Sequence, residues 1–170
     1  MQRPDKTEYD PYYEGYISLV EKEDIIDTLE RQKTELSDAF GGFGEDRGNH
    51  RYAEGKWSIK ELLSHIIDGE RMFGYRVFRI SRGDKTPIEG FEQDDYIENS
   101  HANERGFADM IEEFENLRSA NLLLFRNLKD ADWVRTGTAN DVEISVRALV
   151  FIMAGHVRHH LKILDERYTS

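Results

Sequence analysis

The sequence predicts an all-α protein, a four-helix bundle with long crossover loops. Four segments of the 170-residue chain carry apolar residues at the three- and four-residue spacing of an amphipathic helix. No segment shows a convincing alternation of apolar and polar residues, the pattern that indicates a strand. The chain contains only three prolines, which suits a helix-rich protein. We therefore expect four helices packed around a common core.

The first two helices have recognisable ends. The first is predicted from Asp24 to Phe40, where a pair of glycines stops it. Ser58 followed three residues later by Glu61 is a capping-box pattern, so the second helix should begin there. Its apolar face continues to residue 80, and Gly83 supplies the stop.

The remaining elements follow from the same patterns. The connection over residues 84–103 is long for a compact bundle, and we expect a short helical turn over residues 93–98. The third helix is predicted over residues 104–128 and a loop over residues 129–142, after which Ser145 caps the fourth helix. The tyrosine-rich N-terminal arm, about residues 1–22, should pack on the bundle. We expect one domain over residues 1–170.

Composition excludes several functions. The 34 acidic residues outnumber the 23 basic ones, giving a formal charge of −11, so the surface repels nucleic-acid phosphates and anionic lipid. We expect neither a nucleic-acid partner nor a membrane partner. The chain has no cysteine, which excludes disulfides, thiolate metal sites and a cysteine nucleophile. It shows no secretory signal and no membrane span, so cytoplasmic residence is expected.

Half of the six histidines lie in the fourth predicted helix. His156 and His160 are four residues apart and project into its apolar arc, whereas His159 points away from the centre of that arc. Two imidazoles at this spacing can reach a single ion without distorting the helix. The alternative is a pair of core histidines, each hydrogen-bonded to a carbonyl or a carboxylate.

A metal site needs a further ligand, and His65 on the second helix is the natural third donor. Three imidazoles leave coordination positions open, which describes a catalytic centre rather than a structural one. We expect one divalent metal ion, zinc or nickel ahead of iron or manganese.

Several polar residues near these histidines have two interpretations. Asp68 and Glu70 are candidates for a general base, although the position of Asp68 is more typical of a solvent-exposed carboxylate. Glu70 projects into the apolar stripe and suits a residue that orients a ligand or pairs with an arginine in the core. Arg76 and Arg79 have two interpretations: they bind a carboxylate group of a substrate, or they form ion pairs with acidic residues of the chain. We expect the tyrosines of the arm to cover the edge of the bundle rather than to line a substrate pocket.

Two motifs carry a family resemblance. The W-S-x-x-E-x-x-x-H pattern from Trp57 to His65 and the G-H-x-x-H-H run from Gly155 to His160 resemble the DinB-like superfamily, in particular its YfiT-like branch. The resemblance implies a metal-binding four-helix bundle whose ligands correspond to His65, His156 and His160. It also implies a small-molecule substrate and a homodimer. Members include S-transferases and isomerases that use a low-molecular-weight thiol, and proteins assigned as metal-dependent hydrolases.

The expected mechanism is activation of a nucleophile by the metal. Water with a lowered pKa would give hydrolysis, and a thiol held as thiolate would give S-transfer or isomerisation. That thiol must come from solution, because the chain has no cysteine. Two other interpretations stay open: a non-catalytic metal-binding or stress-response bundle acting as a dimerisation module, and a structural bundle with hydrogen-bonded core histidines.

Overall fold

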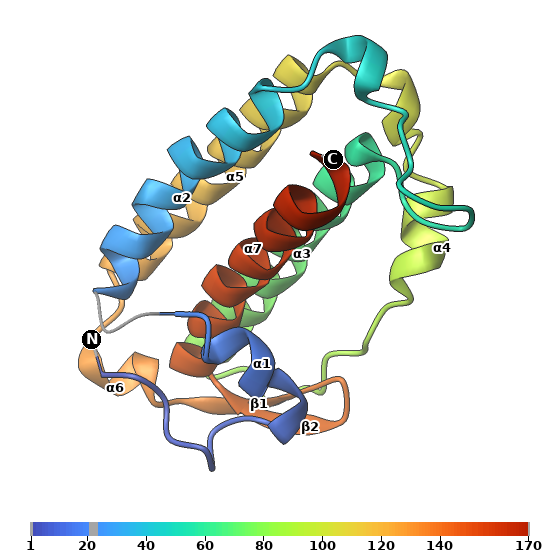
Figure 1. Ribbon diagram of the computed structural model, residues 1–170. Coiled ribbons are helices and arrows are strands. Elements are labelled where there is room, and N and C mark those ends of the chain that lie inside the picture. Colours follow the sequence, from blue (N-terminus) through green and yellow to red (C-terminus); the bar gives the residue numbers. More distant parts are fainter. Residues whose placement is uncertain (1, 21–23, 170) are drawn as a thin grey trace.

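Four long helices dominate the computed structural model, which describes residues 2–20 and 24–169. They are α2 (Ile25–Gly41), α3 (Ile59–Ser81), α5 (Phe107–Arg126) and α7 (Val146–Tyr168). α5 and α7 each pack against both α2 and α3, so the consecutive helices α2 and α3 occupy opposite corners of the bundle (Figure 1). The predicted four-helix bundle is confirmed. None of the described helices is long and apolar enough to span a membrane.

The predicted helix starts are confirmed by their capping bonds. The Ser58 hydroxyl accepts from the Glu61 amide at 3.1 Å, and the Glu61 carboxylate accepts from the Ser58 amide at 2.8 Å. The Ser145 side chain likewise accepts from the Ala148 amide at the start of α7. These bonds satisfy amides that have no partner within the helix. They fix where α3 and α7, the two histidine-bearing helices, begin.

The connection from α3 to α5 follows the expectation closely. Its predicted helical turn is α4 (Gln93–Glu98), and a short 3-10 turn, η3 (Ala102–Glu104), follows. α5 begins at Phe107 rather than at residue 104, because Gly106 is still extended. A second 3-10 turn, η2 (Glu45–Arg47), lies in the glycine-rich connection between α2 and α3.

The segment between α5 and α7 contradicts the predicted loop over residues 129–142. It contains α6 (Asp130–Trp133) and an antiparallel hairpin of β1 (Thr136–Ala139) and β2 (Val142–Ser145). Asn140 and Asp141 both have positive φ, as a two-residue hairpin turn requires. Strands of four residues are too short for a clear alternation, which explains why the sequence pattern missed them.

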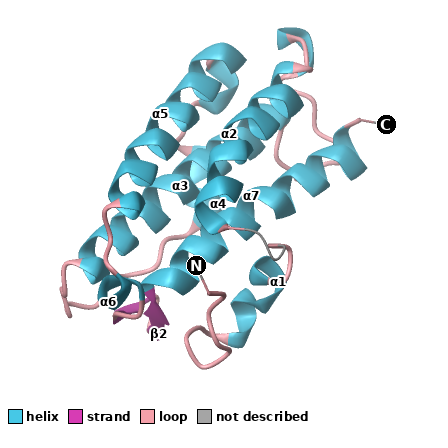
Figure 2. Ribbon diagram, turned by 90° about the vertical axis from the view of Figure 1, so that its left-hand side faces the viewer, coloured by secondary structure: helices cyan, strands magenta, loops and turns pink. Residues whose placement is uncertain are grey.

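The N-terminal arm lies against the same end of the bundle as this hairpin (Figures 1 and 2). It contains η1 (Pro11–Tyr13) and α1 (Glu14–Ile17), and α1 packs on α7. The Glu8 carboxylate accepts from Ser145 and Arg147. The packed arm is therefore observed over its described part, while its residues 1, 21 and 22 lie outside the described residues.

A layer of buried polar side chains divides the apolar core into two clusters. Arg118 of α5 donates to both carboxylate oxygens of Glu70 on α3, at 2.9 and 2.8 Å. It also donates to the Gln32 side chain of α2 at 3.0 Å, and Gln32 donates to the Ala154 carbonyl of α7 at 2.8 Å. The layer thus joins all four long helices halfway along the bundle.

Candidate metal centre

Three histidine rings meet beside this polar layer. The Nε2 atoms of His65 and His156 are 2.9 Å apart, and each lies 3.1 Å from Nε2 of His160. All three residues are buried, with at most 7% of their surface exposed. Within the described part of the chain, this is the one cluster of three or more side chains arranged to hold a metal ion.

Local sequence explains why the rings converge. His156 and His160 stand one turn apart on α7, and His65 reaches them from the neighbouring helix α3. A Cβ atom at Gly69, one turn after His65, would lie 2.8 Å from Cε1 of His156. Glycine at this position therefore leaves room for the His156 ring between the two helices.

The three nitrogens do not form a satisfied hydrogen-bond cluster. A ring nitrogen carries either one hydrogen or one lone pair, so three Nε2 atoms at one point form at most one good mutual hydrogen bond. Of the other two contacts, at least one brings two donors or two acceptors together, and a cation at the common point would relieve this. Zinc lies about 2.0–2.1 Å from its nitrogen ligands, and nitrogens 2.9–3.1 Å apart can share such an ion.

Burial keeps the three rings in the neutral form that binds metal. It lowers the pKa of His65 to about 4, although the nearby Asp94 carboxylate acts in the opposite direction. Burial, together with His65, lowers the pKa of His160 to about 2. The pKa of His156 lies well below its ordinary value, mainly because of burial. At neutral pH all three side chains are therefore uncharged.

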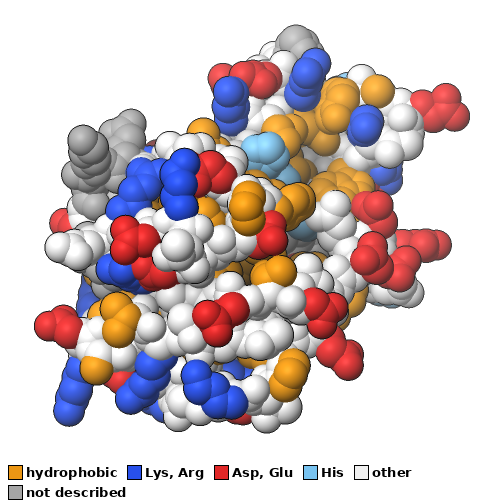
Figure 3. Space-filling view, turned by 90° about the horizontal axis from the view of Figure 1, so that it is seen from below, with side chains coloured by type: hydrophobic (Ala, Val, Ile, Leu, Met, Phe, Trp, Pro, Cys, Tyr) orange, Lys and Arg blue, Asp and Glu red, His pale blue; other side chains and the backbone are white. Residues whose placement is uncertain are grey.

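Two cavities border the three histidines. The first cavity, about 260 Å³, is lined by His65 and His156 together with Tyr13, Tyr16 and Arg76. The second cavity, about 270 Å³, is lined by His160 together with Trp57, Asp94 and Tyr168. On the face seen from below, histidine surface is visible among hydrophobic side chains (Figure 3). Small molecules can therefore approach the histidines by two routes.

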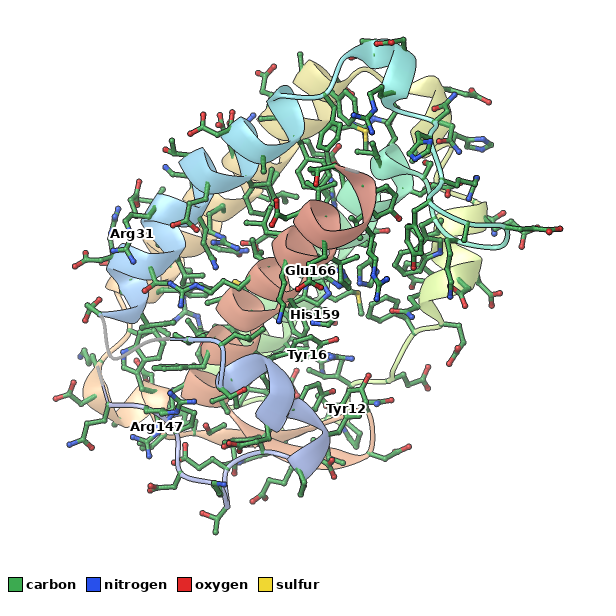
Figure 4. All side chains as sticks on the ribbon, in the orientation of Figure 1. Tyr12, Tyr16, Arg31, Arg147, His159 and Glu166 are labelled. Carbon is green, nitrogen blue, oxygen red and sulfur yellow. The ribbon has the colours of Figure 1, made fainter. Side chains whose placement is uncertain are left out.

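The arm contributes one wall of the first cavity. The Tyr16 ring lies edge-on to His156, with centroids 5.7 Å apart, and to His159, at 5.3 Å. Tyr16 and His159 lie side by side between α1 and α7 (Figure 4). A Cβ atom at Gly155 would stand 2.1 Å from the Tyr16 carbonyl oxygen, so glycine is what lets α1 approach α7 so closely. The arm tyrosines line a pocket as well as cover the bundle edge.

The two candidate bases lie in different surroundings. Glu70 is held by Arg118 and also accepts from Asn121 at 2.7 Å, so the expected pairing with a core arginine is observed. Asp68 is half-buried and lines a separate cavity with Arg71. Burial raises the pKa of Asp68, while Arg71 acts in the opposite direction. A catalytic role for either carboxylate stays a prediction.

The remaining three histidines lie outside the cluster, and one acidic residue lies near it. His50 and His101 are exposed loop residues outside the cluster, and His159 is partly buried beside it. Asp94 on α4 lines the second cavity, a position that sequence reasoning left unassigned. The only sequence signal for a role of Asp94 was its position in the unusually long connection between α3 and α5. A helical projection shows which residues share a face of one helix, so it cannot show that α4 lies near α3.

The sequence profile of the DinB superfamily matches residues 28–164. The chain belongs to the DinB superfamily. The matched region contains all three clustered histidines but begins after the arm. No curated protein sequence matches the chain.

Solved structures share this DinB fold. YfiT from Bacillus subtilis, described as a probable metal-dependent hydrolase with an unusual four-helix bundle topology, superposes with a TM-score of 0.78 at 19% identity. That match covers 94% of this chain and 91% of YfiT. A mycothiol-dependent maleylpyruvate isomerase superposes with a TM-score of 0.70 at 12% identity, over 87% of this chain and 62% of the isomerase. These likenesses establish the fold.

Proposed function

We propose that this DinB-superfamily protein is a metal-dependent enzyme whose ligands are His65, His156 and His160. The observation that carries the proposal is the meeting of three neutral, buried Nε2 atoms within 3.1 Å of one another. When bound, a divalent ion would supply a Lewis acid that lowers the pKa of a coordinated nucleophile. We favour zinc or nickel over iron or manganese.

The residues of the chain would position the reactants around this centre. His65 and His156 line the first cavity and His160 lines the second, so both cavities reach the proposed ligands. Trp57 packs against His65 with ring centroids 4.7 Å apart, which restricts the rotation of that imidazole. Asp94 lies at the second cavity, where a carboxylate can take a proton from an incoming nucleophile.

The two cavities favour a reaction of two substrates over hydrolysis. One cavity would hold a low-molecular-weight thiol from solution and the other an electrophile, with the S–C bond forming as the leaving group departs. The mycothiol dependence of one fold relative agrees with a small thiol as cosubstrate. Hydrolysis is the second candidate, because YfiT is described as a probable hydrolase.

Metal analysis tests the ligand assignment. Protein purified without a nickel column should bind about one equivalent of zinc, and His65→Ala, His156→Ala and His160→Ala should each abolish stoichiometric binding. His159→Ala is the matched control, since His159 belongs to the same motif but not to the cluster. Binding below about a tenth of an equivalent by the wild type would refute the proposal.

Turnover assays then separate the reaction classes. The metal-loaded protein should consume a small thiol in the presence of an electrophilic acceptor and should be inactive toward ester and amide substrates. Ester or amide hydrolysis without thiol would support the second candidate. A metal-loaded protein inactive in every assay would favour the non-catalytic bundle. Homodimerisation remains a separate proposal, which light scattering tests.

A further inference from the structure

Arg76 of α3 is a buried arginine that forms no ion pair with an acidic side chain among the described residues. It is 4% exposed, and its Nη2 donates to the Glu89 carbonyl at 3.3 Å. Its Nε atom has no hydrogen-bond partner among the described residues. Burial lowers the pKa of the guanidinium, and the Tyr13 phenol, which is hydrogen-bonded to the guanidinium, acts in the opposite direction.

This situation differs from that of the neighbouring arginines. Arg118 is equally buried but forms a bidentate pair with Glu70, and Arg79 pairs with Asp84. Buried charges in proteins are normally paired, because removing an unpaired charge from water is costly. A guanidinium held in a buried position with a free donor is therefore suited to an anion that arrives from outside.

The position of Arg76 links it to the histidines. His65, Gly69, Phe73 and Arg76 line the first cavity and follow one face of α3. His65 and Arg76 are eleven positions apart, which corresponds to about 16 Å along the helix axis, and long side chains lean back toward the helix N-terminus. The guanidinium and the histidines thus occupy two ends of one cavity.

The walls between these ends are largely uncharged. Tyr13, Tyr16 and Phe73 supply aromatic surface, and Asn140 contributes an amide from the hairpin turn. The acidic residue of the lining, Glu92, is exposed at the rim, where solvent screens its charge. Inside the cavity Arg76 is the cation available to a ligand.

We propose that Arg76 binds a carboxylate group of the substrate and so orients its opposite end toward His65 and His156. The planar fork of a guanidinium matches the two oxygens of a carboxylate. A cavity of about 260 Å³ limits the ligand to a small molecule. The orientation toward the histidines rests on the proposed function, whereas carboxylate binding at Arg76 does not require a metal.

Binding of small probes to metal-free protein tests this directly. Glutarate and its uncharged diamide, glutaramide, are titrated by amide NMR, with the Tyr13 and Asn140 signals reporting on the first cavity. Inorganic phosphate is titrated in parallel. Glutarate should bind at least about tenfold more tightly than glutaramide and should shift both signals.

Variants of Arg76 and of Arg82, the residue that directly follows α3, locate the interaction. Arg76→Gln should weaken glutarate binding at least about tenfold, and Arg76→Lys should give an intermediate loss because it keeps the charge without the fork. Arg82→Gln is the matched control, since Arg82 is exposed at the end of α3. Zinc binding by each variant, measured separately, should equal that of the wild type.

Several results would overturn the proposal. They are equal affinities for glutarate and glutaramide, equal glutarate affinities for Arg76→Gln and Arg82→Gln, or tighter binding of phosphate than of glutarate. If Arg76→Gln fails to fold, the comparison of diacid with diamide on the wild type still decides. If the wild-type protein binds glutarate but not zinc, the result refutes the proposed metal-dependent enzyme and leaves the carboxylate site at Arg76 supported.

Discussion

Replacing Arg118 with methionine should destabilise the protein by about 3–5 kcal/mol, because it leaves a buried carboxylate without its partner. Arg118 is fully buried and makes two hydrogen bonds to Glu70, one to Gln32 and one to the Leu29 carbonyl. After the substitution, Glu70 would keep only the bond from Asn121 among the side-chain bonds it accepts from described residues.

A second substitution separates loss of charge pairing from loss of packing. Adding Glu70→Gln to Arg118→Met removes the unpaired buried charge while keeping the side-chain shape. The double variant should therefore be more stable than Arg118→Met alone, with a coupling of roughly 2 kcal/mol or more. Arg126→Met is the matched control on α5, because Arg126 forms an exposed pair with Glu30 and should lose less than about 1 kcal/mol.

Urea denaturation and thermal denaturation, each followed by circular dichroism, measure these differences. The melting temperature of Arg118→Met should fall by roughly 10 °C, at about 2–4 °C per kcal/mol for a chain of this size. Additive losses in the double variant would refute the reasoning, because they would mean that Arg118 and Glu70 contribute independently. A loss for Arg118→Met no larger than that for Arg126→Met would refute it as well.

Three further predictions follow from the site. Gly155→Ala should destabilise the protein by about 1–3 kcal/mol, because its Cβ would collide with the carbonyl oxygen of Tyr16; an unchanged urea midpoint would contradict this. His156→Ala should reduce bound zinc, measured by mass spectrometry, from about one equivalent to below about a tenth, while His159→Ala keeps full loading. For the metal-free protein, burial lowers the pKa of His65 from 6.5 to about 4, so the unfolded chain binds a proton first on acidification. Stability should be level above about pH 6.5 and should fall by about 1.4 kcal/mol per pH unit for each such histidine between about pH 6.5 and pH 4; a flat urea-midpoint profile over this range would count against neutral buried rings.

The parts of the fold that depend on local pattern could be predicted from the sequence. Ser58 with Glu61 marks the start of α3, because a capping box satisfies backbone amides within a few residues. The placing of His156 and His160 on one face follows from helical periodicity. Choosing His65 as the partner of that pair needed only the assumption that facing helices build a common site.

Features that depend on packing between distant segments could not be predicted. The β1–β2 hairpin is short, and the first of its strands also pairs with Ile88 of the α3–α5 connection. The diagonal placement of α2 and α3 depends on which helix faces fit best, and apolar periodicity does not reveal this. Tyr16 becomes part of a cavity wall only because Gly155, far along the chain, admits its backbone.

The match to the DinB superfamily begins at residue 28, whereas the tyrosines that border the first cavity precede residue 20. The opening segment therefore supplies part of the wall of the first cavity, whereas the three clustered histidines all lie within the matched region. Substitutions of these tyrosines would change the wall of the first cavity without replacing any of the three imidazoles. Two members of this superfamily that align well over their helices can therefore still differ in the surface that borders this cavity.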